Sequence, residues 1–267
     1  MTYNLLHGGR PDRRDAIVRV IAGQRPDVLA LQELAGWDLA GGRIMRDVAG
    51  ALGMRAFLAR SLVGQPVALL VRADAVVQRA RPVRRPLHHA AMLLRIATDH
   101  GPLTVLSAHL YPWSGRRRLW EARWLAAALR SDLAAAGSGL GLVLGDLNSL
   151  DPWTEHETRL AELSSRYRSR HLRRDGRADV RAIAKLAQRG LVDVFRQTGS
   201  QGRDYTAPSA GPGGAEFSRL RLDYVLATEQ LAAAATSCRT LDEGEAATSS
   251  DHYPVVAEFD VALDSKS

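Results

Sequence analysis

Residues 140–148 read Leu-Gly-Leu-Val-Leu-Gly-Asp-Leu-Asn, an apolar run that ends in two polar side chains, Asp146 and Asn148. A short apolar run of this kind is typical of a buried β-strand, and we predict a strand over Leu140–Gly145. Taken alone, Asp146 could cap the following turn and Asn148 could adopt a left-handed backbone conformation. The alternative interpretation is that the strand presents functional polar groups at one edge of a sheet.

Other apolar stretches also end in, or contain, polar residues that a simple core would not need. These are Asn4, Gln32, Glu33, His109, Asp223 and the tripeptide Ser250-Asp251-His252. Each alone has an ordinary explanation, because strand ends reach the surface. Together, four carboxylates, two asparagines and two histidines suit a hard-cation site, because Mg²⁺ prefers oxygen ligands and needs only one or two direct carboxylates.

Several other catalytic patterns are absent from the sequence. There is no Cys/His cluster with zinc spacing, no Gly-x-Ser-x-Gly elbow and no Walker loop. The single cysteine, Cys238, cannot form a disulfide within the chain. This fits a reducing compartment, and we expect a cytoplasmic protein.

The order of the predicted elements indicates the fold class. Strands alternate with helices in the first half, whereas later strands follow one another closely, as hairpins do, which predicts an α+β fold of two packed sheets flanked by helices. The predicted strands are Thr2–Leu6, Val28–Gln32, Val67–Val71, Ala90–Ala97, Leu103–Leu110, Leu140–Gly145, Leu222–Ala227 and Val255–Val261. The predicted helices are Pro11–Ala22, Arg116–Ala136 (capped by Ser114 and ended by Gly137), one opened by a Thr154/Glu157 capping box, and Asp179–Arg189. Gly199–Arg219 is predicted to be a long loop.

Composition is that of an ordinary globular protein. The 267 residues are 46% hydrophobic and 24% charged, which excludes wholesale disorder, collagen and coiled coil. No apolar run reaches about 18 residues, so we expect no membrane span. The N-terminal residues show no basic segment followed by an apolar run, so no signal peptide is expected.

The formal net charge of +7 is concentrated in one segment. Arg159–Arg189 contains ten basic and three acidic residues, so its formal charge is +7 and the remainder of the chain sums to zero. An arginine bias from a GC-rich genome would spread over the whole chain. The segment is therefore interpreted either as a contact for a polyanion, nucleic acid above all, or as a solvated helix face.

At the polar positions the sequence resembles the endonuclease/exonuclease/phosphatase superfamily. Six pieces occur in the family's order and span residues 2–252. They are Thr2-Tyr3-Asn4, Gln32-Glu33, Ser107-Ala108-His109, Gly145-Asp146-Leu147-Asn148, Arg221-Leu222-Asp223-Tyr224 and Ser250-Asp251-His252. The resemblance implies a four-layer α/β sandwich of two mixed sheets packed face to face with helices outside. It also implies a single domain over 1–267 that hydrolyses phosphoesters with a divalent metal.

The same resemblance implies a metal site. Glu33 matches the principal metal carboxylate of the family, and Asn4 and Asp251 match its neighbours around the ion. The expected cofactor is Mg²⁺, with Mn²⁺ able to replace it. One such ion polarises the phosphoryl group and eases departure of the leaving oxygen.

The remaining matches imply catalytic roles. Asp146 matches the group that orients or deprotonates the attacking water, and Asn148 beside it binds phosphate or metal. His252 matches the histidine that contacts the scissile phosphate, oriented by Asp223. His109 stands where deoxyribonuclease-like members carry a second catalytic histidine, and we hypothesise that it protonates the leaving group.

Two departures from the family narrow the substrate. His109 replaces the tyrosine typical of abasic-site endonucleases, and the Pro-Ala-Trp and Cys-Asp-Arg signature of inositol-phosphate enzymes is absent. These departures argue against those two specialisations. We expect a nuclease acting on DNA or RNA, because the basic segment follows Gly145–Asn148 directly and suits a polyanion. The alternative is a phosphatase or phosphodiesterase for a small or lipid phosphoester, with Trp113, Trp120 and Trp124 near its pocket, although the latter two also have the spacing to pack the inner face of a helix. A silent binding module is disfavoured, because no catalytic position is missing.

Nucleic acid would bind through the basic segment, which we expect to be helical over 154–190. The basic segment follows Gly145–Asn148 directly in the sequence, so we expect it to begin at the sheet edge that carries the candidate catalytic residues. Arginines there would hold phosphates that flank the scissile one, and an aromatic ring would stack on a base. The candidate substrate-binding residues are Arg116, Trp153, Arg166 and Arg170. We expect the protein to act as a monomer.

Overall fold

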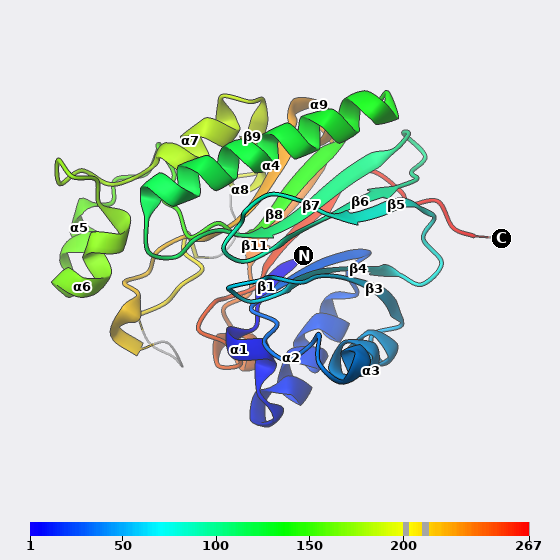
Figure 1. The fold of residues 1–267 in the computed structure, drawn as a ribbon, viewed down its shortest axis with the longest axis horizontal. Helices are drawn as coiled ribbons and strands as arrows, with labels where there is room; N and C mark the ends of the chain where they lie inside the picture. Colours follow the sequence, from blue (N-terminus) through cyan, green and yellow to red (C-terminus); the bar gives the residue numbers. More distant parts are fainter. Residues whose placement is uncertain (200–202, 210–213, 267) are drawn as a thin grey trace.

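The computed structural model describes residues 1–199, 203–209 and 214–266. Two six-stranded sheets pack face to face, with helices on both outer sides (Figure 1). The first sheet has the order β11-β12-β1-β2-β4-β3, formed by β1 (Thr2–Asn4), β2 (Val28–Gln32), β3 (Met54–Ala59), β4 (Val67–Arg72), β11 (Ala235–Thr240) and β12 (Val255–Phe259). The second has the order β5-β6-β7-β8-β10-β9, formed by β5 (Val77–Pro82), β6 (Ala91–Ile96), β7 (Leu103–His109), β8 (Gly141–Asp146), β9 (Leu191–Asp193) and β10 (Asp223–Thr228).

Alternating side chains along the strands build the layers. On β4, Val67, Leu69 and Val71 enter the core between the sheets, whereas Ala68 and Leu70 face the helices beneath the first sheet. The strands of the second sheet alternate in the same way between the central core and the core under its own helices. Burial on both faces explains why these strands are near-continuous apolar runs. The predicted four-layer sandwich is confirmed.

Helices cover each sheet on one side. α2 (Pro11–Gln24) and α3 (Arg43–Ala51) lie against the first sheet, and α4 (Gly115–Ala136) and α7 (Arg181–Ala187) lie against the second (Figure 1). The predicted caps of α4 are confirmed: the Ser114 hydroxyl accepts from the Arg117 amide, and Gly137 ends the helix in a left-handed conformation. The remaining helices are short: α1 (Leu6–Gly9), α5 (Glu157–Ala161), α6 (Ser165–Arg168), α8 (Val194–Gln197), α9 (Glu229–Ala232), η1 (Ala40–Gly42), η2 (Ser169–His171), η3 (Gly214–Glu216) and η4 (Gly244–Ala247).

The basic stretch 154–190 consists of short helices and turns. The predicted Thr154/Glu157 capping box is wrong, because α5 begins only at Glu157, after His156, and the Thr154 amide instead donates to Asp151 Oδ1 at 2.8 Å. The helix predicted over Asp179–Arg189 is shorter, as α7 covers Arg181–Ala187. Of the loop predicted over Gly199–Arg219, residues 200–202 and 210–213 lie outside the described part of the chain. Among the described residues, no helix combines the length and apolar character needed to cross a membrane.

Strand register brings the polar ends of the second sheet together. His109 on β7 pairs with Asp146 on the parallel strand β8, and Asp146 pairs with Asp223 on the antiparallel strand β10. The two sheets are joined at the same edge by hydrogen bonds: Asn4 Nδ2 donates to Asp146 Oδ2 at 3.0 Å, and Gln32 Nε2 donates to Ser107 Oγ at 3.4 Å. This edge, the candidate catalytic edge, is thus the place where the two sheets contact through polar groups.

Gly145, directly before Asp146, is required by its backbone geometry. Its φ is +142°, and a Cβ there would lie 2.0 Å from the Ala108 carbonyl oxygen on β7. We expect Gly145→Ala to destabilise the fold by about 3 kcal/mol or more, because backbone cannot move aside as a flexible side chain can. Urea denaturation measures this. Gly50→Ala is the control, since nothing lies within 4 Å of its Cβ position, and it should leave stability unchanged or slightly raised.

Arg118 anchors the basic segment to the second sheet. This fully buried guanidinium donates to the Arg170 carbonyl at 2.7 Å, and it also donates to the carbonyls of Tyr111 and Pro112 at 3.3 and 3.1 Å. Tyr111 and Pro112 follow β7 closely, so one side chain joins the end of β7 to η2. A small core under α5 and α6, built around Leu150, Leu160, Leu163 and Leu222, completes this attachment.

The buried histidine of η2, His171, is expected to make the stability of the fold sensitive to acid. Burial and the nearby charges of Arg118 and Arg170 lower its pKa to about 3. The ring is neutral in the folded protein and gains a proton on unfolding below pH ~6.5, so its stabilising contribution is complete above that pH and is lost as the pH falls toward 3. At about pH 4.5 the loss is about 2–3 kcal/mol.

Urea denaturation at neutral and acidic pH checks this expectation. His171→Gln should lose less stability on acidification than the unmodified chain. His100→Gln, at an exposed histidine, should follow the unmodified chain. Equal acid sensitivity of His171→Gln and the unmodified chain would show that another group titrates.

Candidate active site

Asp146 lies at the centre of the catalytic edge. Its Oδ2 accepts from Asn4 Nδ2 at 3.0 Å, and it lies 3.3 Å from His109 Nε2 and 4.0 Å from His252 Nε2. Its Oδ1 accepts from the backbone N–H of Asn148 at 2.9 Å. Burial opposes ionisation, but His252 and His109 lower the pKa of Asp146 far below its ordinary value. The carboxylate is therefore held ionised between two histidines.

His252 and Asp223 form a buried pair. His252 Nδ1 lies 2.7 Å from Asp223 Oδ2, and the ring of Phe217 packs edge-on against the imidazole at 5.1 Å between centroids. Burial alone would lower the pKa of His252, but the charges of Asp223 and Asp146 raise it well above its ordinary value. The imidazolium that results is held in one orientation and can donate from Nε2 to a developing anion.

His109 lies opposite this pair. Burial opposes its protonation, but the charge of Asp146 and the hydrogen bond with it raise the pKa of His109 above the ordinary value. The two histidines therefore flank one carboxylate, and its charge favours the protonated form of each. Such a triad can orient a water molecule and donate protons at two positions around it.

A carboxylate group fit for a cation adjoins the triad. Asn4 Nδ2 bridges Asp146 Oδ2 and Glu33 Oε1, the latter at 3.2 Å, while Glu33 Oε2 accepts from the His7 amide at 3.0 Å. Burial and the charges of Glu33 and Asp146 raise the pKa of Asp251, although His252 opposes this. The negative charge gathered here and the oxygen donors suit a hard divalent cation. The structure thus brings the sequence-predicted set Asn4, Glu33 and Asp251 beside Asp146.

Asp146, Asp223 and His252 offer a second possible metal group. One ligand atom from each lies within 4.8 Å of the others, and Asp223 Oδ1 has no hydrogen-bond partner in the described part of the chain. However, His252 Nδ1 is already bonded to Asp223, and a protonated imidazole has no lone pair for a metal. The carboxylates around Glu33 are the better ligands on these grounds.

Two site residues adopt strained backbone conformations. Glu33 has φ +58° and Asn148 has φ +48°, both in the left-handed region. The Asn148 side chain donates to the Leu110 carbonyl at 3.1 Å, which ties the residue to the end of β7. Non-glycine residues in this region cluster at functional sites, because the surrounding contacts must hold them there.

Comparison with known proteins identifies the family. The sequence model described as Endonuclease/Exonuclease/phosphatase family matches residues 1–252. The chain belongs to the endonuclease/exonuclease/phosphatase family. It is accordingly a metal-dependent phosphoesterase, and the resemblance drawn from the six motifs is confirmed. No curated protein matches the sequence significantly.

Solved structures share the fold of this phosphoesterase. An AP endonuclease from Archaeoglobus fulgidus matches with a TM-score of 0.70 and 18% identity, covering 97% of this chain and 98% of that one. A 3′ phosphatase from Neisseria bound to a product DNA hairpin matches with a TM-score of 0.67 and 21% identity, covering 97% and 98%. A mannosyl-6-phosphatase from Bacteroides thetaiotaomicron matches with a TM-score of 0.71 and 14% identity, covering 98% of both chains.

The predicted substrate-binding residues lie in different surroundings. Arg116 is exposed at the start of α4, and Arg166 is exposed on α6 with its guanidinium 5.7 Å from the Tyr167 ring. The Arg170 guanidinium lies 4.8 Å from the centre of the same Tyr167 ring, and it forms an ion pair with Glu216. Trp153 packs against the core beneath α7, with the Arg196 guanidinium 5.1 Å from its ring. None of the contacts described for Trp153 joins it to the catalytic side chains.

Local pairing neutralises part of the basic segment. Arg159 pairs with Asp204 at 2.8 Å, Arg173 pairs with Asp175 at 3.1 Å, and Arg181 pairs with Asp179 at 2.6 Å. Six basic side chains of the segment form no ion pair within the described part of the chain: Arg166, Arg168, Arg174, Arg177, Lys185 and Arg189. The excess charge therefore rests on these six residues.

Tryptophans near His109 differ in exposure. Trp113 is 53% exposed and contacts His88 edge-on at 5.6 Å between centroids, while Tyr111 contacts the same histidine at 4.8 Å. Trp124 packs against the core, but Trp120 is 47% exposed, under the guanidinium of Arg123. Trp120 therefore does not pack the inner face of its helix, because α4 turns only a narrow stripe toward the sheet.

Sequence reasoning missed two polar residues of the site, Gln65 and His89. Gln65 Nε2 donates to Glu33 Oε2 at 3.1 Å, and the His89 ring stacks on that of His109. Both precede strands, β4 and β6, that run antiparallel to the strands ending at Glu33 and His109. The start of an antiparallel strand lies at the same sheet edge as the end of its partner. The signal in the sequence was therefore a polar residue just before a strand that pairs antiparallel with a strand ending in a site residue.

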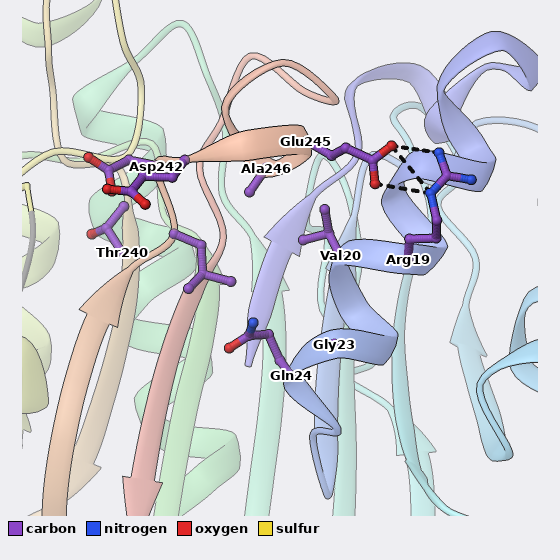
Figure 2. A pocket seen from close by; sticks show the side chains of 10 residues that line it. Arg19, Val20, Gly23, Gln24, Thr240, Asp242, Glu245 and Ala246 are labelled. Carbon is purple, nitrogen blue, oxygen red and sulfur yellow. Dashed lines mark hydrogen bonds and ion pairs between the residues drawn. The ribbon is translucent and has the colours of Figure 1, made fainter.

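A pocket of about 450 Å³ lies away from these side chains, between α2 and η4 (Figure 2). Its walls carry Arg19 and Glu245, which pair at 2.6 Å, and Asp242, which pairs with Arg203. Arg19 and Glu245 are exposed, and each of these three charged groups has an ion-pair partner. The pocket therefore offers none of the ionised, buried groups that distinguish the catalytic edge.

Proposed function

We propose that this phosphoesterase is a Mg²⁺-dependent nuclease that hydrolyses phosphodiester bonds of DNA or RNA by in-line attack of water. One observation carries the choice of nucleic acid: the buried Arg118 holds the basic segment against the end of β7, next to His109. The same segment approaches His252, because Arg170 pairs with Glu216, whose neighbour Phe217 packs on the His252 ring. The basic segment is thus attached close to His109 on one side and to His252 on the other, which supports a role in holding a polyanionic substrate.

The residues of the edge divide the reaction among them. Asp146 orients the attacking water and accepts its proton, since it is ionised and held by Asn4 and Asn148. His252, oriented by Asp223, donates to the developing charge on the phosphoryl oxygens, and His109 supplies a proton to the leaving oxygen. Glu33, Asn4 and Asp251 would hold the cation, which supplies further stabilisation of charge on the phosphoryl group.

Substrate phosphates on either side of the scissile one would bind Arg116, Arg166 and Arg170. Arg116 and Arg166 are exposed and can pair with phosphate oxygens without first breaking a buried contact, whereas Arg170 would exchange its ion pair with Glu216 for one with phosphate. Tyr167, between Arg166 and Arg170, is better placed than Trp153 to stack on a base. We expect a monomer acting in the cytoplasm, in keeping with the lone buried Cys238.

A small or lipid phosphoester is the second candidate substrate. The half-exposed Trp113, packed with Tyr111 and His88 beside the His89–His109 stack, favours it. Such an aromatic wall would contact the apolar part of a compact substrate. This candidate uses the same metal and the same catalytic residues.

A substrate panel separates the candidates. Plasmid DNA, single-stranded DNA, RNA, an abasic duplex, a nucleotide monoester and a phospholipid are each incubated with Mg²⁺ or Mn²⁺, with EDTA as control. We expect cleavage of a nucleic acid, with kcat/KM falling about tenfold or more between about 50 and 200 mM salt. A flat salt response, or hydrolysis of the monoester or phospholipid alone, would contradict the nuclease proposal.

A further inference from the structure

His89 lies directly against the catalytic His109. The two imidazole rings are parallel, with centroids 3.8 Å apart, and His89 is only 7% exposed. Burial and the charges of His109 and His88 lower the pKa of His89 to about 2, so this ring is neutral, whereas the pKa of His109 is raised. The chain thus buries a second, uncharged imidazole beside its catalytic one.

The loop between β3 and β4 determines which nitrogen of His89 carries the proton. His89 Nδ1 lies 2.9 Å from the backbone nitrogen of Gln65, whose N–H can only donate. Nδ1 must therefore offer a lone pair, and the proton of the neutral ring is on Nε2. The fit of this loop is close, because a Cβ at Gly64 would lie 2.6 Å from both His89 Nδ1 and the His88 carbonyl oxygen.

The Nε2–H group of His89 is buried and has no acceptor within the described part of the chain. His109 Nδ1 is unpartnered there as well. Because imidazole hydrogen bonds lie in the ring plane and the two rings are parallel, neither ring can satisfy the other. Buried donors are almost always paired, and one left unpaired beside a catalytic group needs an acceptor from a ligand.

We propose that His89 binds substrate, its Nε2–H donating a hydrogen bond to an oxygen of the phosphate group on which the site acts. This role for His89 rests on the proposed phosphoester hydrolysis. It would give the active site a fixed, uncharged hydrogen-bond donor. Gln65 links this donor to the metal carboxylates, since its backbone contacts His89 and its side chain contacts Glu33. Phosphate would thus bind between the cation and the stacked histidines.

Two variants at position 89 separate the donor from the ring. His89→Phe keeps an aromatic ring against His109 and removes the donor, so kcat/KM should fall about 10- to 100-fold. His89→Gln places an amide N–H near the lost Nε2–H and should recover most of that loss. His100→Phe, at an exposed histidine in the turn between β6 and β7, is the control and should stay within about twofold. An unchanged His89→Phe, or equal losses in both variants, would overturn the proposal.

A measurement without turnover keeps this result separate from the nuclease proposal. In the ¹⁵N-histidine spectrum of the full chain with Mg²⁺, we expect His89 to carry its proton on Nε2 and the Nε2 signal to move when inorganic phosphate is added. A proton on Nδ1, or a phosphate titration that leaves Nε2 unmoved, would overturn the role of His89. Phosphate contact without nucleic-acid cleavage would instead overturn only the choice of substrate.

Discussion

Asp146→Asn is expected to lower kcat/KM by about three orders of magnitude or more. Asparagine keeps the size of the side chain and can still accept from the Asn148 amide at Oδ1. It removes the negative charge that lies between His109 and His252 and that raises the pKa of both. The variant therefore loses the acceptor for the proton of water and weakens the two cationic donors together.

The Asp146→Asn measurement is single-turnover hydrolysis of the best substrate in the panel. Asp132→Asn is the matched control, because Asp132 is also a fully buried carboxylate, bonded to Arg95 at 3.1 Å and Thr104 at 3.0 Å on the far part of α4. It should lose stability but keep the activity of its folded fraction within a few-fold. Hydrolysis that survives in Asp146→Asn would contradict the whole assignment of the site.

Removal of divalent metal is expected to abolish activity, and Glu33→Gln should raise the Mg²⁺ concentration for half-maximal rate by about tenfold or more. Glu33 is a carboxylate whose oxygens already accept from Asn4, His7 and Gln65. Burial opposes ionisation of Glu33, but the charge of His109 and the hydrogen bond from the His7 amide lower its pKa. The side chain therefore presents a charged ligand. Glutamine keeps the shape but contributes no charge.

Asp223→Asn distinguishes the two possible metal groups. Because Asp223 is paired with His252, its replacement should lower kcat while leaving the Mg²⁺ concentration for half-maximal rate nearly unchanged. Calorimetric metal binding to both variants supplies a second measure. If Asp223→Asn weakened metal binding more than Glu33→Gln, the ion would belong to the group of Asp146, Asp223 and His252 instead.

Prediction of strands from the sequence succeeded in the interior of both sheets and failed at their edges. The eight predicted strands correspond to β1, β2, β4, β6, β7, β8, β10 and β12, and the four that were missed, β3, β5, β9 and β11, are the edge strands. Interior strands are covered on both faces, so their sequences are apolar runs. β5 reads Val-Gln-Arg-Ala-Arg-Pro and is mostly exposed, so nothing in its composition indicates a strand.

The sequence also located the charged segment without showing which of its charges are paired. The sequence located the net charge of +7 in one segment, but the ion pairs of Arg159 and Arg170 are with Asp204 and Glu216, which are distant in sequence. Only folding determines which arginines remain available to a ligand. Arg118 lies within the helix predicted over Arg116–Ala136, and only the structure shows that it is fully buried and connects two segments.

The sequence by itself determined the family, the interior strands and the polar residues that end them, because apolar runs interrupted by carboxylates, amides and imidazoles are local patterns. The tertiary structure decided which of those groups contact one another: Asp146 between two histidines, Asn4 across the two sheets, and Gln65 with His89 beside them. These contacts depend on strand register and on antiparallel pairing between distant segments. A hydrogen bond requires atoms within about 3 Å, and only the folded chain specifies position at that scale.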